Sequence, residues 1–260
     1  MSPGAFLFAF GHTRLYHRLG CNLEDAGFII KDCLCWGYAC GMPHSYNIGK
    51  ADSTDKWDGW GTQLKTAWEP IIMAQKPLEG TYIDNVNKYN VGGLNIDECR
   101  IPYKDENDKN SIASFEHFTK KNYGDDRYFS ANIGNKKQCN IHPNGRWPAN
   151  LIWMDPLFVQ YDHIFMVPKP SKNEKGRDNV HETVKPIELM ERLIRLVTPR
   201  PSVANEEIFV MDPFMGSGTT GIAAQNLGRS FCGYEKDPDH FALAKQRLKP
   251  KTKCFDMFAR

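Results

Sequence analysis

Long apolar segments are scarce in this chain of 260 residues. The apolar run Ala5–Phe10 is too short to cross a bilayer, and no basic stretch precedes it as in a signal peptide. We therefore expect a cytoplasmic protein without a membrane partner. Hydrophobic residues make up 41% of the chain, which at this length favours one globular domain with a sizeable core.

The sequence also lacks a charge excess, internal repeats and low-complexity tracts. Its 33 basic and 31 acidic residues leave a net charge of only +2. Such a chain has no global basic field, which neither supports nor excludes nucleic acid as a partner.

Cysteine pairs with the spacing typical of structural zinc are missing, although the chain has eight cysteines. Cys33, Cys35, Cys40 and His44 are the nearest approach to a ligand set. Cys33 and Cys35 alternate with larger apolar residues along an expected strand, which favours buried thiols that pack as small apolar groups. We expect reduced cysteines and no metal.

One glycine-rich segment carries the strongest functional signal. Met211–Thr220 reads Met-Asp-Pro-Phe-Met-Gly-Ser-Gly-Thr-Thr, with an apolar run before it and a helix-like stretch after it. A strand, a glycine turn and a helix in this order are typical of the place where a doubly wound sheet holds a nucleotide-like cofactor. A nucleoside-triphosphate loop is disfavoured, because Ile222 stands where that motif needs lysine.

The acid in front of the glycines helps to choose the cofactor. Asp212 would repel the pyrophosphate of a nicotinamide dinucleotide but attract the sulfonium and ammonium groups of S-adenosylmethionine. The helix start after Gly218 offers free N–H groups to a carboxylate. Glu235 ends the next expected strand, where an acid accepts hydrogen bonds from a ribose, but both cofactors carry that ribose. A dinucleotide site and a turn without a ligand remain open on these residues alone.

Several stretches together resemble one family of enzymes. Asp212–Thr219 resembles the cofactor motif of DNA methyltransferases that modify exocyclic amino groups of adenine or cytosine. Thr183–Met190 is similar to the segment that precedes this motif in the permuted members and wraps the methionine end of the cofactor. Further stretches match in the order of that class: Pro3–Gly11, Thr13–Leu19, Trp60–Pro70 and Gly145–Asn150.

The resemblance implies an α/β fold with a Rossmann-like doubly wound methyltransferase sheet, and S-adenosyl-L-methionine as cofactor. It assigns cofactor contacts to the following residues: Thr183, Lys185, Pro186, Asp212, Pro213, Phe214, Gly216, Ser217, Gly218, Thr219 and Glu235.

The family's catalytic motif, Asp/Asn/Ser-Pro-Pro-aromatic, is absent from the sequence. Asp155–Phe158 is the nearest string and lacks the second proline. No catalytic residue is therefore assigned. The family places the missing motif before the strand Ala5–Phe10, on a central strand of the sheet, so we expect two inner sheet edges without a neighbour. A missing N-terminal segment or a partner chain would supply that strand.

Three parts are expected along a single methyltransferase domain: a partial catalytic half over 1–99, a target-recognition insert over 100–162 and a cofactor-binding half over 163–260. The insert is polar and rich in lysine, aspartate and asparagine, so a solvated surface segment is the alternative. Its cations and rings, with those of the following basic loop, suit phosphate contact and base stacking. The expected DNA-binding residues are Lys136, Lys137, Arg146, Trp147, Lys169 and Lys172.

The sequence therefore predicts a site-specific methyltransferase that acts on double-stranded DNA in a bacterial or phage-infected cell. The resemblance favours adenine N6 over cytosine N4. Because the catalytic motif is missing, the chain is expected to be inactive by itself or to be a cofactor- and DNA-binding fragment of a split enzyme. A nicotinamide-dependent oxidoreductase is the weaker alternative.

Overall fold

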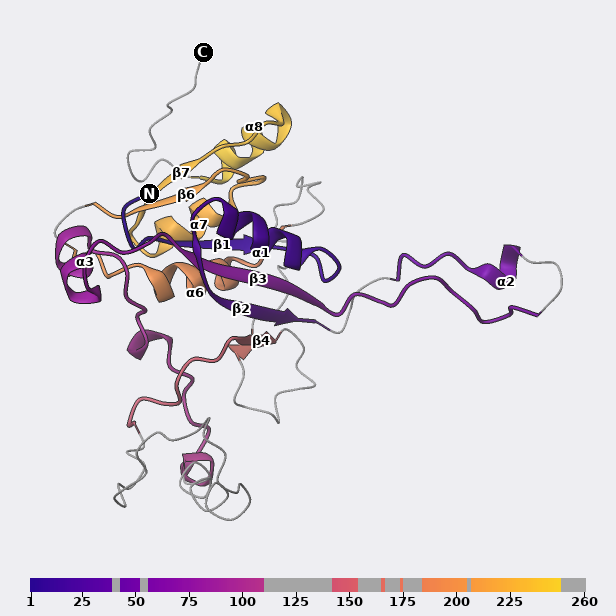
Figure 1. Ribbon diagram of the computed structural model, residues 1–260, viewed down its shortest axis with the longest axis horizontal. Coiled ribbons are helices and arrows are strands. Elements are labelled where there is room, and N and C mark those ends of the chain that lie inside the picture. The colour runs from indigo at the N-terminus through magenta and orange to yellow at the C-terminus, as the bar shows by residue number, and fades with distance from the viewer. Residues whose placement is uncertain are drawn as a thin grey trace.

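A computed structural model of the chain describes residues 1–38, 43–51, 56–109, 142–153, 165–166, 174, 184–204 and 207–248. Its described strands form two sheets (Figure 1). The larger sheet has the order β1-β3-β2-β4-β5, and the smaller sheet pairs β6 with β7. The strands are β1 (Phe6–Phe10), β2 (Ile29–Gly37), β3 (Trp68–Gln75), β4 (Leu151–Trp153), β5 (Phe165–Met166), β6 (Phe209–Asp212) and β7 (Ser230–Gly233).

Strand directions differ between the two parts of the larger sheet. β3 pairs antiparallel with both β1 and β2, whereas β2–β4, β4–β5 and β6–β7 are parallel pairs. The named helices are α1 (Tyr16–Asp25), α2 (Ile48–Ala51), α3 (Tyr82–Tyr89), the short 3-10 helix η1 (Asp97–Cys99), α6 (Ile187–Val197), α7 (Thr219–Asn226) and α8 (Pro238–Arg247).

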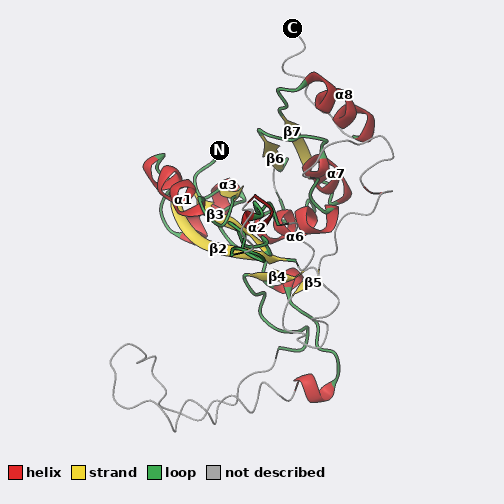
Figure 2. Ribbon diagram, turned by 90° about the vertical axis from the view of Figure 1, so that its right-hand side faces the viewer, coloured by secondary structure: helices red, strands yellow, loops and turns green. Residues whose placement is uncertain are grey.

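Helices cover both faces of the larger sheet (Figure 2). On β3, Ile72 faces α1, where a Cβ added to Gly20 would lie 3.7 Å from its Cδ1 atom. Ile71 faces the other way and packs in one core cluster with Leu189 of α6. This alternation is what a strand buried on both faces requires.

Helix α6 joins the two sheets because it has two buried faces. Leu189 and Leu193 pack in the core of the larger sheet, whereas Ile194 packs with α7 and β7. The spacing of Ile187 and Ile194 in the sequence predicts one apolar stripe, which faces the smaller sheet, but it does not predict the second face. Proline is typical of a first helical position, but here Pro186 caps the helix and does not occupy its first turn.

The described strands fall into two separate sheets, and none of them lies between β1 and β6. Among the described strands, β1 pairs only with β3 and β6 only with β7, so each has one edge without a neighbour. The uncovered face of β6 leaves Phe209 54% and Met211 56% exposed. An apolar strand face with a free edge is the arrangement that a missing neighbouring strand and its helix would leave.

Most N-terminal elements match the sequence prediction. The apolar runs Ala5–Phe10, Phe28–Trp36 and Trp68–Gln75 of the sequence predict strands, and they form β1, β2 and β3 to within one residue. The pattern of residues 13–26 predicts a helix that Gly27 ends; the helix begins at Tyr16, and Gly27 follows it with a φ of +87°. Cys33 and Cys35 are half-buried, not fully buried as expected, and burial raises the pKa of both thiols.

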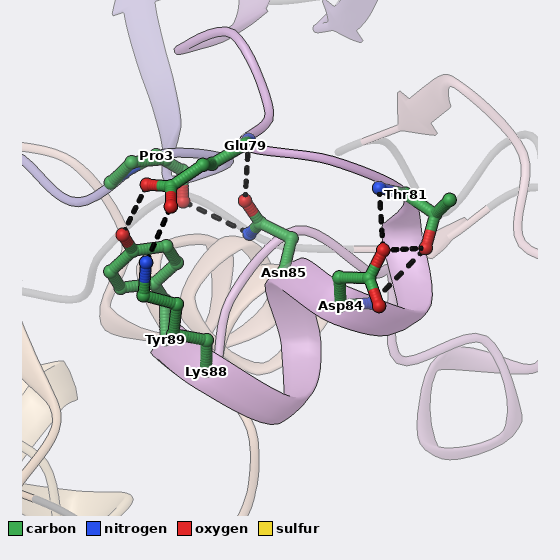
Figure 3. A network of polar contacts seen from close by, with 7 residues as sticks. All are labelled: Pro3, Glu79, Thr81, Asp84, Asn85, Lys88 and Tyr89. Atoms are coloured by element: carbon green, nitrogen blue, oxygen red, sulfur yellow. Dashed lines mark hydrogen bonds and ion pairs between the residues drawn. The ribbon is translucent and has the colours of Figure 1, made fainter.

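The first residues of the chain are held by a polar network on α3 (Figure 3). Asn85 is fully buried, and its amide donates to the carbonyls of Pro3 and Val91 at 3.0 and 2.7 Å. Its side-chain oxygen accepts the N–H of Glu79 at 3.1 Å. This network fixes the turn that leads into β1, an edge strand of the larger sheet.

No helix within the described ranges is both long and apolar enough to cross a membrane. The predicted division into three parts stays a prediction, since residues 110–141, the larger part of the expected insert, lie outside the described residues.

Candidate cofactor site

The turn between β6 and α7 has the backbone that its glycines predict. Gly216 and Gly218 have φ angles of +53° and +82°, a region that favours glycine. Gly218 is also the cap residue of α7, and a Cβ on it would lie 3.2 Å from the Cβ of Ala244 in α8. Gly218 therefore serves both the turn and the close packing of two helices.

Asp212 shapes this turn. One of its carboxylate oxygens accepts the N–H of Phe214 at 3.0 Å, and the other accepts the hydroxyl of Thr220 at 2.6 Å. The sequence treated Asp212 only as a partner for a cationic ligand. Its local bonds fix the carboxylate at the carboxyl end of β6, where its remaining lone pairs and its charge still act on a ligand.

Glu235 lies beside Asp212 because the register of β6 and β7 pairs Asp212 with Gly233. Its two oxygens accept the N–H groups of Gly216 at 2.8 Å and Asp237 at 2.9 Å. The hydrogen bond from Asp237, and to a lesser extent that from Gly216, holds the pKa of Glu235 below its usual range despite partial burial. Two acids therefore flank the glycine turn at one end of the two-stranded sheet.

Burial separates the remaining predicted contacts into two groups. Ser217 and Thr219 are buried, with 3% and 6% of their surface exposed. Pro213 is exposed, and Phe214 is 87% exposed beside the turn. The phenyl ring is thus available to a planar ligand, whereas the buried Ser217 hydroxyl accepts a hydrogen bond from Arg247.

The sequence analysis missed Arg247, which binds the turn from α8. Its guanidinium donates to the main-chain carbonyl and the hydroxyl of Ser217 at 2.6 and 2.7 Å. A cation in the last turn of a helix is common, so sequence alone gave no sign that this one reaches another element.

Lys185 lies at the junction with the larger sheet. Its ammonium donates to Glu69 at 2.8 Å and lies over the rings of Phe10 and Trp36 at 5.1 and 5.4 Å from their centroids. Pro186 is buried at the start of α6, and Thr183 lies outside the described residues. Lys185 thus ties the predicted methionine-end segment to the carboxyl end of β1; its contact with a cofactor stays a prediction.

The donors and acceptors of this site suit S-adenosylmethionine. The first turn of α7 has N–H groups without partners inside the helix, which favour a carboxylate. Asp212 and Glu235 provide negative charge for the cationic and ribose groups, and Phe214 provides a ring. Asp212 at the turn is unfavourable for the pyrophosphate of a dinucleotide, whereas Glu235 suits the ribose of either cofactor.

The predicted DNA contacts are only partly described. Arg146 forms an ion pair with Asp108 and lies over the ring of Tyr103. Trp147 is 65% exposed, and Arg100 lies 5.5 Å from its ring centroid. Arg146 is thus engaged within the protein, whereas the Trp147 ring is accessible. Lys136, Lys137, Lys169 and Lys172 lie outside the described residues, and all six assignments stay predictions.

An arm projects from the end of the larger sheet (Figure 1). It carries α2, and its two sides meet at an antiparallel bridge between Asn47 and Gly61. Trp57 and Trp60 form an edge-to-face pair with ring centroids 5.1 Å apart. The polar, glycine-rich composition of this part of the sequence predicts a long loop.

No cluster of three or more metal-ligating side chains occurs in the part of the chain that the structure describes.

Comparison with known proteins identifies related chains. A family model of N6 and N4 methyltransferases, described as DNA methylase, matches residues 1–246. The Type II methyltransferase M.HindIII of Haemophilus influenzae is 29% identical over 266 residues, which cover 98% of this chain and 67% of that protein. The Type II methyltransferase M1.MboII of Moraxella bovis is 30% identical over 189 residues, which cover 72% of this chain and 56% of that protein.

A solved structure shares the fold. The crystal structure of an M1.HpyAVI–SAM complex has a TM-score of 0.50 at 22% identity, over 96% of this chain and 76% of that one. The chain thus spans about two thirds of M.HindIII and just over half of M1.MboII.

Proposed function

Because this chain belongs to the family of N6 and N4 DNA methylases, we propose that it takes part in methyl transfer from S-adenosylmethionine to an exocyclic amino group in DNA. The observation that carries the proposal is the turn Asp212–Thr219 with Glu235 beside it, within a family match that covers residues 1–246. Adenine N6 is the favoured target, by resemblance only. The DNA contacts assigned above belong to the same proposal.

Within this site the cofactor's parts have distinct partners. Glu235 would accept hydrogen bonds from the ribose hydroxyls, and the N–H groups at the start of α7, from Thr219 onward, would hold the methionine carboxylate. Asp212 would attract the cationic groups, Phe214 would offer its ring to the cofactor, and Thr183–Pro186 would flank the methionine end. When bound, the cofactor supplies an electrophilic methyl carbon; the chain's own residues hold and orient it.

A second proposal concerns the free sheet edges at β1 and β6. We infer that an added segment, either further N-terminal residues or a partner chain, places a strand between β1 and β6. The exposed Phe209 and Met211 side chains and the unpaired edges support this inference. That strand would bring the Pro-Pro-aromatic motif, which holds the target amino group, to the carboxyl end of β1 and the Lys185 side chain.

A methyl-transfer assay tests both proposals. The 260-residue chain is incubated with double-stranded DNA and radiolabelled S-adenosylmethionine, alone and as a version extended upstream in its reading frame. We expect cofactor binding without transfer by the chain alone, and transfer once a Pro-Pro-aromatic motif is supplied. Transfer by the chain alone would refute the need for an added segment. If the chain does not bind the cofactor, the assignment of the turn is wrong.

A further inference from the structure

Arg247 links two segments that the proposed function places around the cofactor. Two of its hydrogen bonds go to Ser217 in the glycine turn, and a third goes to the main-chain carbonyl of Glu174 at 3.0 Å. The carboxylate of Glu174 accepts the N–H of Ile187 at 2.7 Å. Ile187 is the first residue of α6 and directly follows Lys185 and Pro186. One connected path of hydrogen bonds therefore runs from the turn to the start of α6.

The chemistry of the guanidinium suits this link. Its donors form a rigid planar fork, so one group can hold acceptors on different segments. Burial lowers the pKa of Arg247 and the charge of Glu174 opposes that shift, but a guanidinium remains a cation at neutral pH. A lysine at this place would present a single ammonium and could not reproduce the geometry.

A helix-end role is the simpler alternative for this arginine. Cations in the last turn of a helix stabilise it by interaction with its dipole. The guanidinium of Arg247 donates three hydrogen bonds to Ser217 and Glu174, both outside α8. Arg247 therefore connects the glycine turn with Glu174 and does not cap its own helix, α8.

The groups proposed to hold the ribose end and the methionine end of the cofactor differ in how much they depend on Arg247. The ribose partner, Glu235, is held by the N–H groups of Gly216 and Asp237, without Arg247. Ser217 directly precedes the cap residue of α7, and the proposed carboxylate site begins just beyond it. A loosened Ser217 carbonyl thus disturbs the methionine side of the site more than the ribose side.

We propose that Arg247 is a positioning residue that sets the methionine end of the cofactor site by fixing the glycine turn to the start of α6. This inference rests on the proposed function, because it names the support for that site. Nothing in it requires Arg247 to touch the cofactor.

The test compares two ligands on matched variants. S-adenosylmethionine and methylthioadenosine share the adenosyl part, but only the first has the carboxylate and ammonium. Calorimetric titrations are run on wild type, Arg247→Lys and Arg229→Lys. Arg229 is a suitable control because it too is withdrawn from solvent, buried where Arg247 is half-buried, and donates to main-chain carbonyls away from the turn, including Pro199 at 2.8 Å.

We expect Arg247→Lys to weaken S-adenosylmethionine binding by about 10-fold to 100-fold, since a charge-assisted hydrogen bond contributes up to that factor, and to leave methylthioadenosine nearly unchanged. Arg229→Lys should leave the affinity ratio of the two ligands at the wild-type value. Equal weakening of both ligands by Arg247→Lys, or no weakening, would overturn the inference. Lack of S-adenosylmethionine binding by wild type would instead overturn the proposed function.

A second variant covers the case in which Arg247→Lys fails to fold. Glu174→Ala removes the carboxylate that accepts the N–H of Ile187 but keeps the main-chain carbonyl that Arg247 binds. We expect the same selective loss of S-adenosylmethionine affinity. Unchanged binding of both ligands by a folded Glu174→Ala chain would show that the path to α6 does not matter.

Discussion

Replacing Asn85 with leucine tests the anchor that holds the N-terminal turn to α3. The substitution keeps the branched shape of the side chain but leaves three main-chain groups without their partner: the carbonyls of Pro3 and Val91 and the N–H of Glu79. Figure 3 shows the bonds to Pro3 and Glu79. Each group that loses its partner costs about 1 kcal/mol, so we expect a loss of roughly 3 kcal/mol in the free energy of unfolding. That is a large share of the stability of a typical domain.

The assay is urea unfolding followed by circular dichroism, with the midpoint and slope fitted separately. Asn87→Leu is the matched control, because Asn87 is exposed on the same helix and should change stability by no more than about 0.5 kcal/mol. A loss below about 1 kcal/mol for Asn85→Leu, with an unchanged slope, would refute the reasoning from unsatisfied hydrogen bonds. Gly4 gives an independent check: its φ is +75°, and an added Cβ would lie 2.9 Å from the Cγ atom of Asn85, so Gly4→Ala should also destabilise.

Two further predictions concern the cofactor half. Gly221→Ala places a Cβ 2.6 Å from a methyl carbon of Leu248 and 2.7 Å from the Phe231 ring. Thermal unfolding should therefore show a loss of about 1–3 kcal/mol in the free energy of unfolding, and an unchanged midpoint would contradict this packing. Glu235 has a folded-state pKa below its ordinary value because of its hydrogen bond from Asp237, so its contribution to stability is complete above the ordinary pKa and is lost as pH falls through the lowered one. The free energies of unfolding of wild type and Glu235→Gln, measured between about pH 7 and about pH 3, should converge at the acid end. A difference that stays constant with pH would contradict the lowered pKa of Glu235.

Local sequence patterns predicted the elements that local chemistry determines. Alternating and continuous apolar runs located β1, β2 and β3, and Gly216 and Gly218 located the turn before α7. The acids at the ends of β6 and β7 were also found, since strand order alone brings them to one edge.

Long-range partners were the part that the sequence could not provide. The second buried face of α6 depends on which sheet Leu189 and Leu193 meet, and the bond from Arg247 to Ser217 joins residues 30 positions apart. The hydrogen bonds of Asp212 to Phe214 and Thr220 were not predicted, because the sequence analysis considered only its charge toward a ligand. The ordered family motifs still led to the correct family, because a resemblance over several stretches does not depend on any single contact.

Calorimetric titration of the 260-residue chain with S-adenosylmethionine, with the nicotinamide dinucleotide as a parallel ligand, tests the central claim most directly. We expect saturable binding of S-adenosylmethionine to one site, weakened by Glu235→Ala, and no binding of the dinucleotide. Binding of the dinucleotide in preference, or S-adenosylmethionine binding that Glu235→Ala leaves unchanged, would contradict the assignment of this turn as a methyl-donor site.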